Sequence, residues 1–277
     1  DVERLEIDRR KNSLFETEDS HVCVPFHLRE TETQLSRFVD PSPFVPADEA
    51  ARRKHCEDVF AIQAMGLKKR MEHTGAATAV IGISGGLDST LALLVIARAF
   101  DLMKKSRKDI VAVTMPGFGT TDRTYDNAVN MIKQLGATFM EVSIKESVRQ
   151  HFKDINHNEN NHDVTYENAQ ARERTQILMD IANHMSMYCV NGSVPKMLVR
   201  HVVRYYADTC GEEVLAKVLY DVLDTPVSPE LLPPENGQIA QKTEDLVGPY
   251  ELHDFVLYYV LLFGFSPEKI YMLARIA

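Results

Sequence analysis

Residues 79–100 read AVIGISGGLDSTLALLVIARAF. The apolar run at 79–83 is typical of a buried strand in a parallel sheet, residues 84–89 predict a tight turn, and residues 90–100 predict a helix packed on that strand. The two glycines of the turn allow the backbone to approach a ligand closely. The unpaired N–H groups and the positive end of the helix dipole point into the same turn, so this stretch favours the binding of an anion, most of all a phosphate.

The turn differs from the Walker phosphate loop, because no Gly-Lys-Ser/Thr sequence follows it. We therefore expect a phosphate to be held by backbone dipoles, a metal ion, residues from elsewhere in the chain and the hydroxyl groups of Ser84, Ser89 and Thr90. An ordinary strand-to-helix connection, with glycines present only for packing, is the alternative interpretation. A strand, then Ser-Gly-Gly-x-Asp-Ser, then an apolar helix is much rarer than a loop rich in glycine and serine, and this favours the phosphate site.

The composition is that of a large globular chain with an acidic balance. Its 277 residues are 44% hydrophobic, enough for a sizeable core, and its net charge of −9 argues against a general nucleic-acid binder. The four cysteines form no CxxC pair, which indicates a reduced, cytoplasmic protein without a zinc knuckle or disulfide framework. No signal peptide is visible. The longest apolar run, at 255–265, is too short to span a membrane and is expected to be a core helix.

Strands and helices alternate along the middle of the chain. Further strands are expected at 109–115 and 138–142, and helices at 122–135, 144–155, 165–184, 196–207, 211–223 and 252–263, with a short one after Pro267. This alternation predicts an open parallel sheet flanked by helices on both faces, with right-handed crossovers. Ligands of such sheets bind outside the carboxyl ends of the strands, so the turns at 84–89 and 116–121 should face one crevice.

The first part of the chain carries weaker signals. Residues 1–40 are charged and irregular, with VERLEIDRR as a weak strand candidate, and a stiff proline-rich connector follows. A long amphipathic helix is expected from residue 50 to 73, with core contacts from Ile62, Met65 and Met71.

The segment at 156–163, NHNENNHD, is polar and predicts a solvated loop. His157 and His162 could suggest a metal site, but no cysteine or carboxylate spacing supports one. In the helix that follows, Asn168 and Arg172 lie one turn apart and share a face. From the residues alone, Arg172 is as consistent with a surface ion pair as with a ligand contact.

Five stretches together carry a resemblance. They are residues 82–90, MPGFGTT at 115–121, YENAQAR at 166–172, MYCVNGSVPK at 187–196 and SPELLP at 228–233. Over residues 41–277 the chain resembles the synthetase domain of glutamine-dependent NAD+ synthetases, which belong to the N-type ATP pyrophosphatases. The resemblance implies a Rossmann-like fold of the adenine nucleotide alpha hydrolase type.

The resemblance also implies a two-step ligase reaction. ATP adenylylates the nicotinate carboxylate of deamido-NAD+ (nicotinic acid adenine dinucleotide) and releases pyrophosphate. Ammonia then displaces AMP, giving NAD+. The expected ligands are ATP, Mg²⁺, deamido-NAD+ and ammonia, and a homo-oligomer that binds neither nucleic acid nor membrane is expected.

Residue roles follow from the same resemblance. Asp88 and Lys196 are the expected catalytic residues, with Asp88 as the magnesium ligand and Lys196 reaching an ATP phosphate. Asn168 and Arg172 are expected to contact deamido-NAD+. ATP is expected to contact Gly82, Ile83, Ser84, Gly85, Gly86, Leu87, Asp88, Ser89, Lys196 and Ser228.

The sequence departs from the family pattern in two places. Members of the family carry a Gly-Thr-Gly-Asp turn, a strand and a metal-binding glutamate between positions that correspond to His184 and Met187. Either this segment is deleted, which should cripple catalysis, or it is a mobile segment absent only from the given sequence. We favour the second, because a missing inner strand would leave the parallel sheet with an unpaired edge. Glutamine-dependent members also carry an N-terminal glutaminase domain of nitrilase type. Residues 1–40 are then expected to be the connector from that domain, and the C-terminus to be clipped.

Two other functions remain open at this point. Another N-type ATP pyrophosphatase, such as a GMP synthetase or a tRNA-thiolating enzyme, shares the Ser-Gly-Gly-x-Asp-Ser turn, although thiolating enzymes usually show paired cysteines and a basic RNA surface. A nucleotide-binding regulatory module without catalysis is the third candidate.

Overall fold

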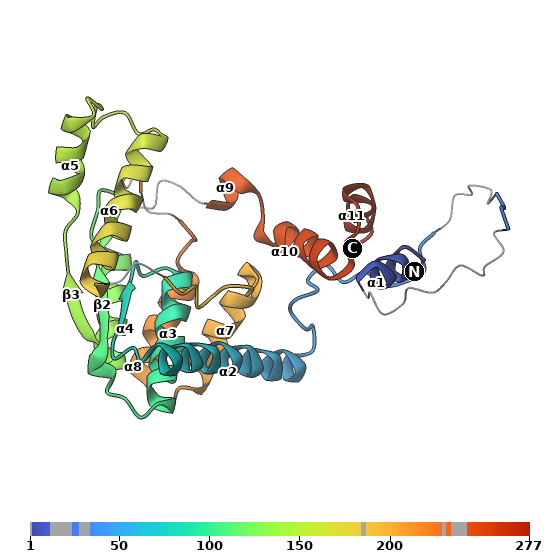
Figure 1. Ribbon diagram of the computed structural model, residues 1–277, viewed down its shortest axis with the longest axis horizontal. Coiled ribbons are helices and arrows are strands. Elements are labelled where there is room, and N and C mark those ends of the chain that lie inside the picture. Colours follow the sequence, from blue (N-terminus) through green and yellow to red (C-terminus); the bar gives the residue numbers. More distant parts are fainter. Residues whose placement is uncertain (1, 12–23, 28–33, 184–186, 229–230, 234–242) are drawn as a thin grey trace. The chain divides into compact units, whose positions relative to one another are not determined.

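The computed structural model describes residues 2–11, 24–27, 34–183, 187–228, 231–233 and 243–277. They divide into two units, one spanning Pro46–Tyr250 and the other combining Asp1–Val45 with Glu251–Ala277 (Figure 1). The assignment of residues 1–40 as a connector, with the synthetase domain at 41–277, stays a prediction.

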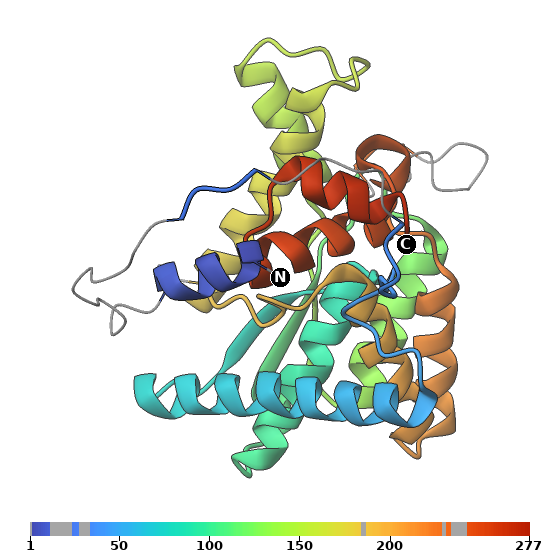
Figure 2. The ribbon, with the colours of Figure 1, turned by 90° about the vertical axis from the view of Figure 1, so that its right-hand side faces the viewer.

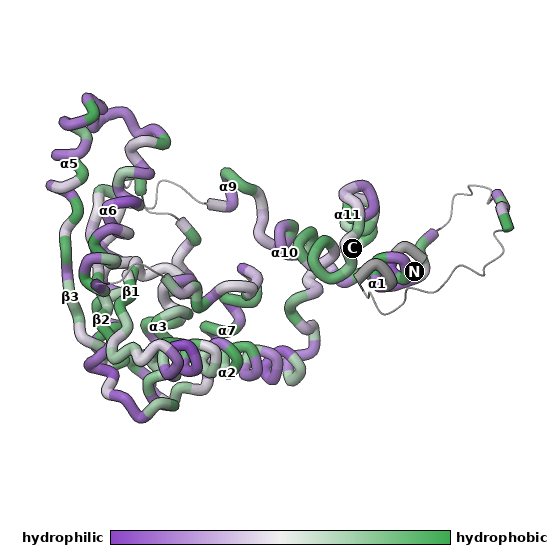
Figure 3. The backbone as a smooth tube through the Cα atoms, in the orientation of Figure 1, coloured by the Kyte–Doolittle hydropathy of each residue, from purple (hydrophilic) through white to green (hydrophobic). Residues whose placement is uncertain are grey.

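The larger unit is built on a parallel sheet of three strands in the order β1, β2, β3. They are β1 (Ala79–Gly82), β2 (Ile110–Thr114) and β3 (Thr138–Glu141), within one or two residues of the expected bounds. Ala79 pairs with Ile110, and Val111 with Thr138. Because β2 lies between the other two strands, it is the most buried, and Figure 3 shows the hydrophobic character of these strands in green.

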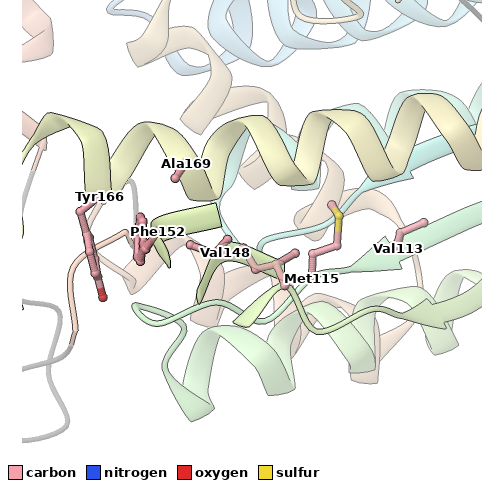
Figure 4. Close-up of a cluster of buried hydrophobic side chains, with 7 residues drawn as sticks. Val113, Met115, Val148, Phe152, Tyr166 and Ala169 are labelled. Carbon is pink, nitrogen blue, oxygen red and sulfur yellow. The ribbon is translucent and has the colours of Figure 1, made fainter. Parts of the chain in front are cut away.

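Helices cover both faces of the sheet, as the alternating pattern predicts. α3 (Leu87–Leu102) packs against β1 and β2, and α4 (Asp122–Leu135) packs against β2 and β3. On the other face, α6 (Val164–Ala182) packs against β1 and α5 (Lys145–Asp154) against α6. Figure 4 shows the buried side chains between β2 and these two helices, namely Val113, Met115, Val148, Phe152, Tyr166 and Ala169.

The ends of these helices follow local signals in the sequence. α4 has the predicted bounds: Thr121 caps its start by accepting from the Thr124 N–H, and Gly136 ends it in the left-handed conformation at φ +70°. Asp163 caps α6 in the same way as Thr121 caps α4. The expected elements of the sheet layer are therefore confirmed.

Three more helices complete the layer that holds α3. The long α2 (Glu49–Thr74), blue in Figure 2, packs against α3 and α7 (Lys196–Thr209), while α8 (Glu213–Asp224) packs against α3, α4 and α7. The predicted core face of α2 is wrong in part. Met71 is buried, but Ile62 is 71% and Met65 51% exposed, because α2 buries the stripe formed by Cys56, Phe60, Gln63, Ala64, Leu67 and Met71. α9 (Thr243–Val247) is a short helix near the end of this unit.

The smaller unit is helical. It contains α1 (Val2–Lys11), α10 (Tyr250–Tyr258) and α11 (Pro267–Ala274). α10 continues as a short π-helix, η3 (Tyr259–Phe263). The strand predicted for VERLEIDRR is therefore wrong, because these residues form α1. The core of the smaller unit joins Val39 to Phe255, Ile270 and Leu273.

The apolar run at 255–265 is not the core helix expected from its composition. Phe255 is buried, but Val260 is 44% and Leu261 66% exposed, so only one side of the helix is covered in the described residues. None of the described helices is long and apolar enough to cross a membrane.

Candidate functional site

The loop between β1 and α3 is fixed to the neighbouring strand and helix. The Ile83 N–H donates to the Val113 carbonyl at 2.8 Å, and the Thr114 hydroxyl donates to the Ile83 carbonyl at 3.0 Å. Gly85 has φ +85°, and a Cβ atom there would lie 2.2 Å from the carbonyl oxygen of Thr124. Only glycine fits this position, because both the backbone conformation and the contact with the start of α4 exclude a side chain.

Hydroxyl groups organise the inside of the loop. The Ser84 and Ser89 hydroxyls lie 3.2 Å apart, and the Gly86 N–H donates to the Ser84 hydroxyl at 3.2 Å. The Ser89 and Thr90 hydroxyls donate to the Gly86 carbonyl at 3.0 and 2.9 Å. Gly86 is the N-cap of α3 and supplies no side-chain cap. The first N–H groups of α3 are therefore left for a ligand, as the sequence predicts for an anion site.

Two charged residues distant in the sequence meet at this loop. Asp88, in the first turn of α3, accepts a hydrogen bond and ion pair from Lys196, the first residue of α7. The Asn191 side chain donates to the Asp88 carbonyl at 2.8 Å, while the Gln63 side chain of α2 donates to the Val190 carbonyl at 3.0 Å. The segment before α7 is thus tied to both α2 and the loop, which places Lys196 beside the predicted phosphate site.

Ser228 lies at the same loop. A cavity of about 80 Å³ is lined by Ser84, Gly86, Leu87, Asp88, Ser89, Val222, Thr225, Pro226, Val227 and Ser228. The structure therefore brings five of the predicted loop residues and Ser228 to one cavity, with Lys196 paired to Asp88 at its edge. Of the other predicted ATP contacts, Gly82 and Ile83 line a second cavity and Gly85 lines neither.

The segment that carries Ser228 follows α8, whose end is anchored to α4. The Arg123 guanidinium donates to both carboxylate oxygens of Asp221, at 2.9 and 2.6 Å, and the Asn127 side chain donates to the same carboxylate at 2.6 Å. These hydrogen bonds, led by that of Arg123, hold the pKa of Asp221 below its usual value. Thr225 donates to the Asp221 carbonyl at 2.8 Å, which joins the anchor to the cavity wall.

A second cavity, of about 200 Å³, opens at the carboxyl ends of β1 and β2. It is lined by Gly82, Ile83, Ser84, Thr114, Met115, Pro116, Thr120, Tyr125, Ala128, Arg174 and Leu178. The turn after β2 thus faces the same crevice as the loop after β1, as expected. The Tyr125 hydroxyl donates to Glu141 at 2.5 Å, which raises the pKa of the tyrosine.

Sequence reasoning missed two residues of this second cavity, Tyr125 and Arg174. The Arg174 guanidinium donates to the Met115 carbonyl at 3.3 Å. The spacing of Arg174 from Arg172 could have indicated its role. Two positions along a helix place a side chain on a different face, so Arg174 is not expected on the face shared by Asn168 and Arg172.

Asn168 and Arg172 lie elsewhere. Both are exposed, and they line an open groove of about 510 Å³ along α6, with Ala171, Thr175, Gln176, Met179 and Asp180. They share a face, as predicted, but the structure does not bring them to the cavities at the β1 loop.

The two histidines of the polar loop have structural contacts. The His157 ring nitrogen Nε2 lies 3.0 Å from a carboxylate oxygen of Asp163, and the His162 ring packs on Tyr166. The Tyr166 N–H is the main cause of the lowered pKa of Asp163, the N-cap of α6. Among the residues that the structure describes, no group of three or more histidine, cysteine or acidic side chains could hold a metal ion.

Residues 60–205, which include the β1 loop, the α6 helix and Lys196, match the family model described as NAD synthase. The chain belongs to the NAD synthase family. It is similar to the glutamine-dependent NAD(+) synthetase of Mycobacterium leprae, with 41% identity over 85% of this chain and 39% of that one. The protein of the same name from Mycobacterium tuberculosis is 39% identical over 87% of this chain and 40% of that one. This member of the family thus spans about two fifths of the length of these curated relatives.

Solved structures support the fold. A glutamine-dependent NAD+ synthetase from Acinetobacter baumannii, solved in complex with ADP, has a TM-score of 0.53 and 19% identity over 84% of this chain and 45% of that one. An NMN synthetase from Francisella tularensis has a TM-score of 0.55 and 18% identity over 79% of this chain and 93% of that one. The similarity confirms the expected fold class, an open parallel sheet flanked by helices.

Proposed function

We propose that this chain catalyses the synthetase reaction of its family, the ATP-dependent amidation of deamido-NAD+ to NAD+ through an adenylylated intermediate, with release of pyrophosphate and AMP. The observation that carries the proposal is the meeting of Asp88 and Lys196 at the glycine-rich start of α3. The family match favours a synthetase over a module that binds nucleotides only for regulation. The family match favours this reaction over that of other ATP pyrophosphatases.

The loop has the groups that the first step requires. Attack of the substrate carboxylate on the α-phosphate spreads negative charge over the phosphates and the departing pyrophosphate. The N–H groups at the start of α3 and the hydroxyls of Ser84 and Ser89 are fixed donors for that charge. Lys196, which neutralises Asp88 in this structure, would exchange the carboxylate for an ATP phosphate, and Ser228 would line the nucleotide from the opposite wall.

The donor set fits Mg²⁺ that arrives with ATP. In nucleotide sites this ion is usually held by one or two carboxylates together with substrate phosphates and water. Asp88 supplies one carboxylate, and its side chain is 53% exposed at the loop. Bound there, Mg²⁺ would act as a Lewis acid on the phosphate oxygens.

For the second substrate we propose the α6 groove. Arg172 supplies a cation and Asn168 an amide on one exposed face, a combination suited to the phosphates and ribose hydroxyls of a dinucleotide. Under this proposal deamido-NAD+ binds along the exposed face of α6. Arg174 and the second cavity lie on the other face of the same helix.

The remaining parts of the proposal concern the parent protein. We propose that ammonia comes from glutamine hydrolysis by a nitrilase-type glutaminase domain, that the protein works in the cytoplasm, and that it is a homo-oligomer. The name of the curated relatives, and the two fifths of their length that this chain spans, support a glutamine-dependent parent.

The proposal is tested by Asp88→Asn in the parent protein, because the given sequence is expected to lack the segment that carries the family's metal-binding glutamate. Pyrophosphate release with ATP, Mg²⁺, deamido-NAD+ and ammonium should fall by about 100-fold or more, because metal stabilisation worth several kcal/mol is lost. Asp101→Asn is the matched control, since it breaks an ion pair with Arg107 at the other end of α3 and should leave the rate unchanged. Normal pyrophosphate release by folded Asp88→Asn would refute the assignment.

A further inference from the structure

Gln170 is a fully buried polar residue in the middle of α6, with 0% of its surface exposed. A buried amide must find hydrogen-bond partners for its oxygen and its nitrogen, because each unpaired group is costly. The partners that Gln170 uses are backbone groups of two distant segments, so the side chain acts as a connection between parts of the fold.

The amide oxygen and nitrogen of Gln170 point to different segments. The oxygen accepts a hydrogen bond from the Phe118 N–H at 3.1 Å, in the turn that follows β2. The nitrogen donates to the Leu231 carbonyl at 2.8 Å, and more weakly to the Tyr166 carbonyl of its own helix at 3.4 Å. One side chain therefore links α6 to both the β2 turn and the segment after α8.

The β2 turn is shaped for this connection. A Cβ atom at Gly117 would lie 2.8 Å from the Gln170 oxygen and 2.6 Å from the Arg174 guanidinium, closer than side chains normally approach. The Leu232 side chain packs on the buried cluster that contains Tyr166. Two neighbouring residues after α8 are thus held in place, Leu231 by the Gln170 amide and Leu232 by this apolar contact.

The segment held at Leu231 carries Ser228 only three positions earlier. Three residues of extended chain span at most about 11 Å, so fixing the Leu231 carbonyl limits where Ser228 can lie. At its other end the segment is held by Thr225 and the Asp221 anchor. Ser228, in the wall of the 80 Å³ cavity at the β1 loop, therefore lies three positions from Thr225 and three from Leu231, and both of those residues are held by hydrogen bonds.

We propose that Gln170 is a positioning residue for ATP: its bond to the Leu231 carbonyl limits where Ser228, three positions earlier, can lie in the wall of the nucleotide cavity. Gln170 does not line that cavity. This inference rests on the proposed function, because it takes the cavity at the β1 loop to be the ATP site.

The first test is Gln170→Met, which keeps the volume of the side chain and removes its hydrogen bonds to Phe118, Leu231 and Tyr166. ATP binding to the chain in the presence of Mg²⁺, measured by calorimetry, should weaken about tenfold, equivalent to about 1.4 kcal/mol. Binding of deamido-NAD+ should not change, although Asn168 and Arg172 lie on the same helix. General damage to α6 would weaken both ligands, and that result would overturn the proposal. Gln134→Met, at an exposed position of α4, is the matched control and should change neither affinity.

Gln170→Glu separates the two connections. Its carboxylate can still accept from the Phe118 N–H but has no donor for the Leu231 carbonyl, so ATP binding should be at least as weak as in Gln170→Met. Affinity equal to that of the unaltered chain would show that Leu231 is not the contact that matters.

If either variant fails to fold, hydrogen exchange in the unaltered chain without ligand tests whether the Gln170 amide is placed as the proposal requires. The Phe118 amide should exchange slowly because its N–H is bonded to Gln170, and fast exchange contradicts the connection. Failure of the unaltered chain to bind ATP would refute the proposed function and its extension to Gln170 together, whereas the exchange result tests the connection independently of ATP.

Discussion

Replacing Gly85 by alanine should destabilise the protein through two separate effects. The residue has φ +85°, a conformation that costs an alanine about 1–2 kcal/mol. The new Cβ atom would also lie 2.2 Å from the carbonyl oxygen of Thr124, so the β1 loop or the start of α4 must move. Overpacking of this kind costs about 1–3 kcal/mol. Together the effects amount to about 2–5 kcal/mol, a large share of the about 5–15 kcal/mol that stabilises a typical domain.

Gly136→Ala is the control that isolates the steric term. Gly136 has a similar conformation, φ +70°, but nothing lies within 4 Å of the position of its Cβ atom. It should therefore lose only the backbone term of about 1–2 kcal/mol. Both substitutions restrict the unfolded chain equally, so that contribution cancels in the comparison.

The assay is urea unfolding of the two variants and the unaltered chain. We expect Gly85→Ala to lie about 1–3 kcal/mol below Gly136→Ala in free energy of unfolding. Because the displaced segment is the phosphate loop, ATP binding should weaken in Gly85→Ala alone. Equal free energies of unfolding for the two variants would refute the reasoning, since they would show that the loop relaxes around the methyl group without cost.

Three further predictions follow from the site. Arg172→Ala should weaken deamido-NAD+ binding and spare ATP binding in calorimetry, and the reverse would show that the two nucleotides have been assigned to each other's sites. Asp221→Asn should lower stability at pH 7 by up to about 1 kcal/mol, since the pair is well exposed. Arg123 lowers the folded pKa of Asp221, so the contribution of the pair to stability is present above the unfolded pKa and is lost as the pH falls through the folded pKa. The difference from the unaltered chain in urea unfolding should therefore shrink as the pH is lowered below about 4, and a constant difference contradicts the prediction. The parent protein should contain roughly twenty more residues between His184 and Met187, and a peptide from an active enzyme that runs directly from His184 to Met187 would exclude them.

The last prediction concerns the chain between the end of α6 and residue 187. Residues 184–186 lie outside the described residues. Among the described strands, β1 pairs only with β2, and residues 187–195 contain no strand. The outer edge of β1 is therefore the place where the strand expected from the resemblance could pair.

Local patterns in the sequence determined the sheet layer of this protein. The bounds of α4 could be predicted because Thr121 and Gly136 are chemical start and stop signals that act within one helical turn. The phosphate loop could be predicted for the same reason, since its glycines, hydroxyls and helix start are adjacent in the chain. A charged N-terminal stretch such as VERLEIDRR has no comparable signal, so the strand predicted there is wrong and the residues form a helix.

Only the tertiary structure decided which faces are buried and which distant residues meet. The apolar residues of α2 do not show by themselves that Phe60 and Leu67 are covered while Ile62 is exposed, because burial depends on where α3 and α7 pack. The same holds for Gln170, whose partners lie 52 and 61 positions away in the sequence. A helical period identifies a face of a helix, but a hydrogen bond between distant segments exists only after the sheet and its helices have brought their backbones together.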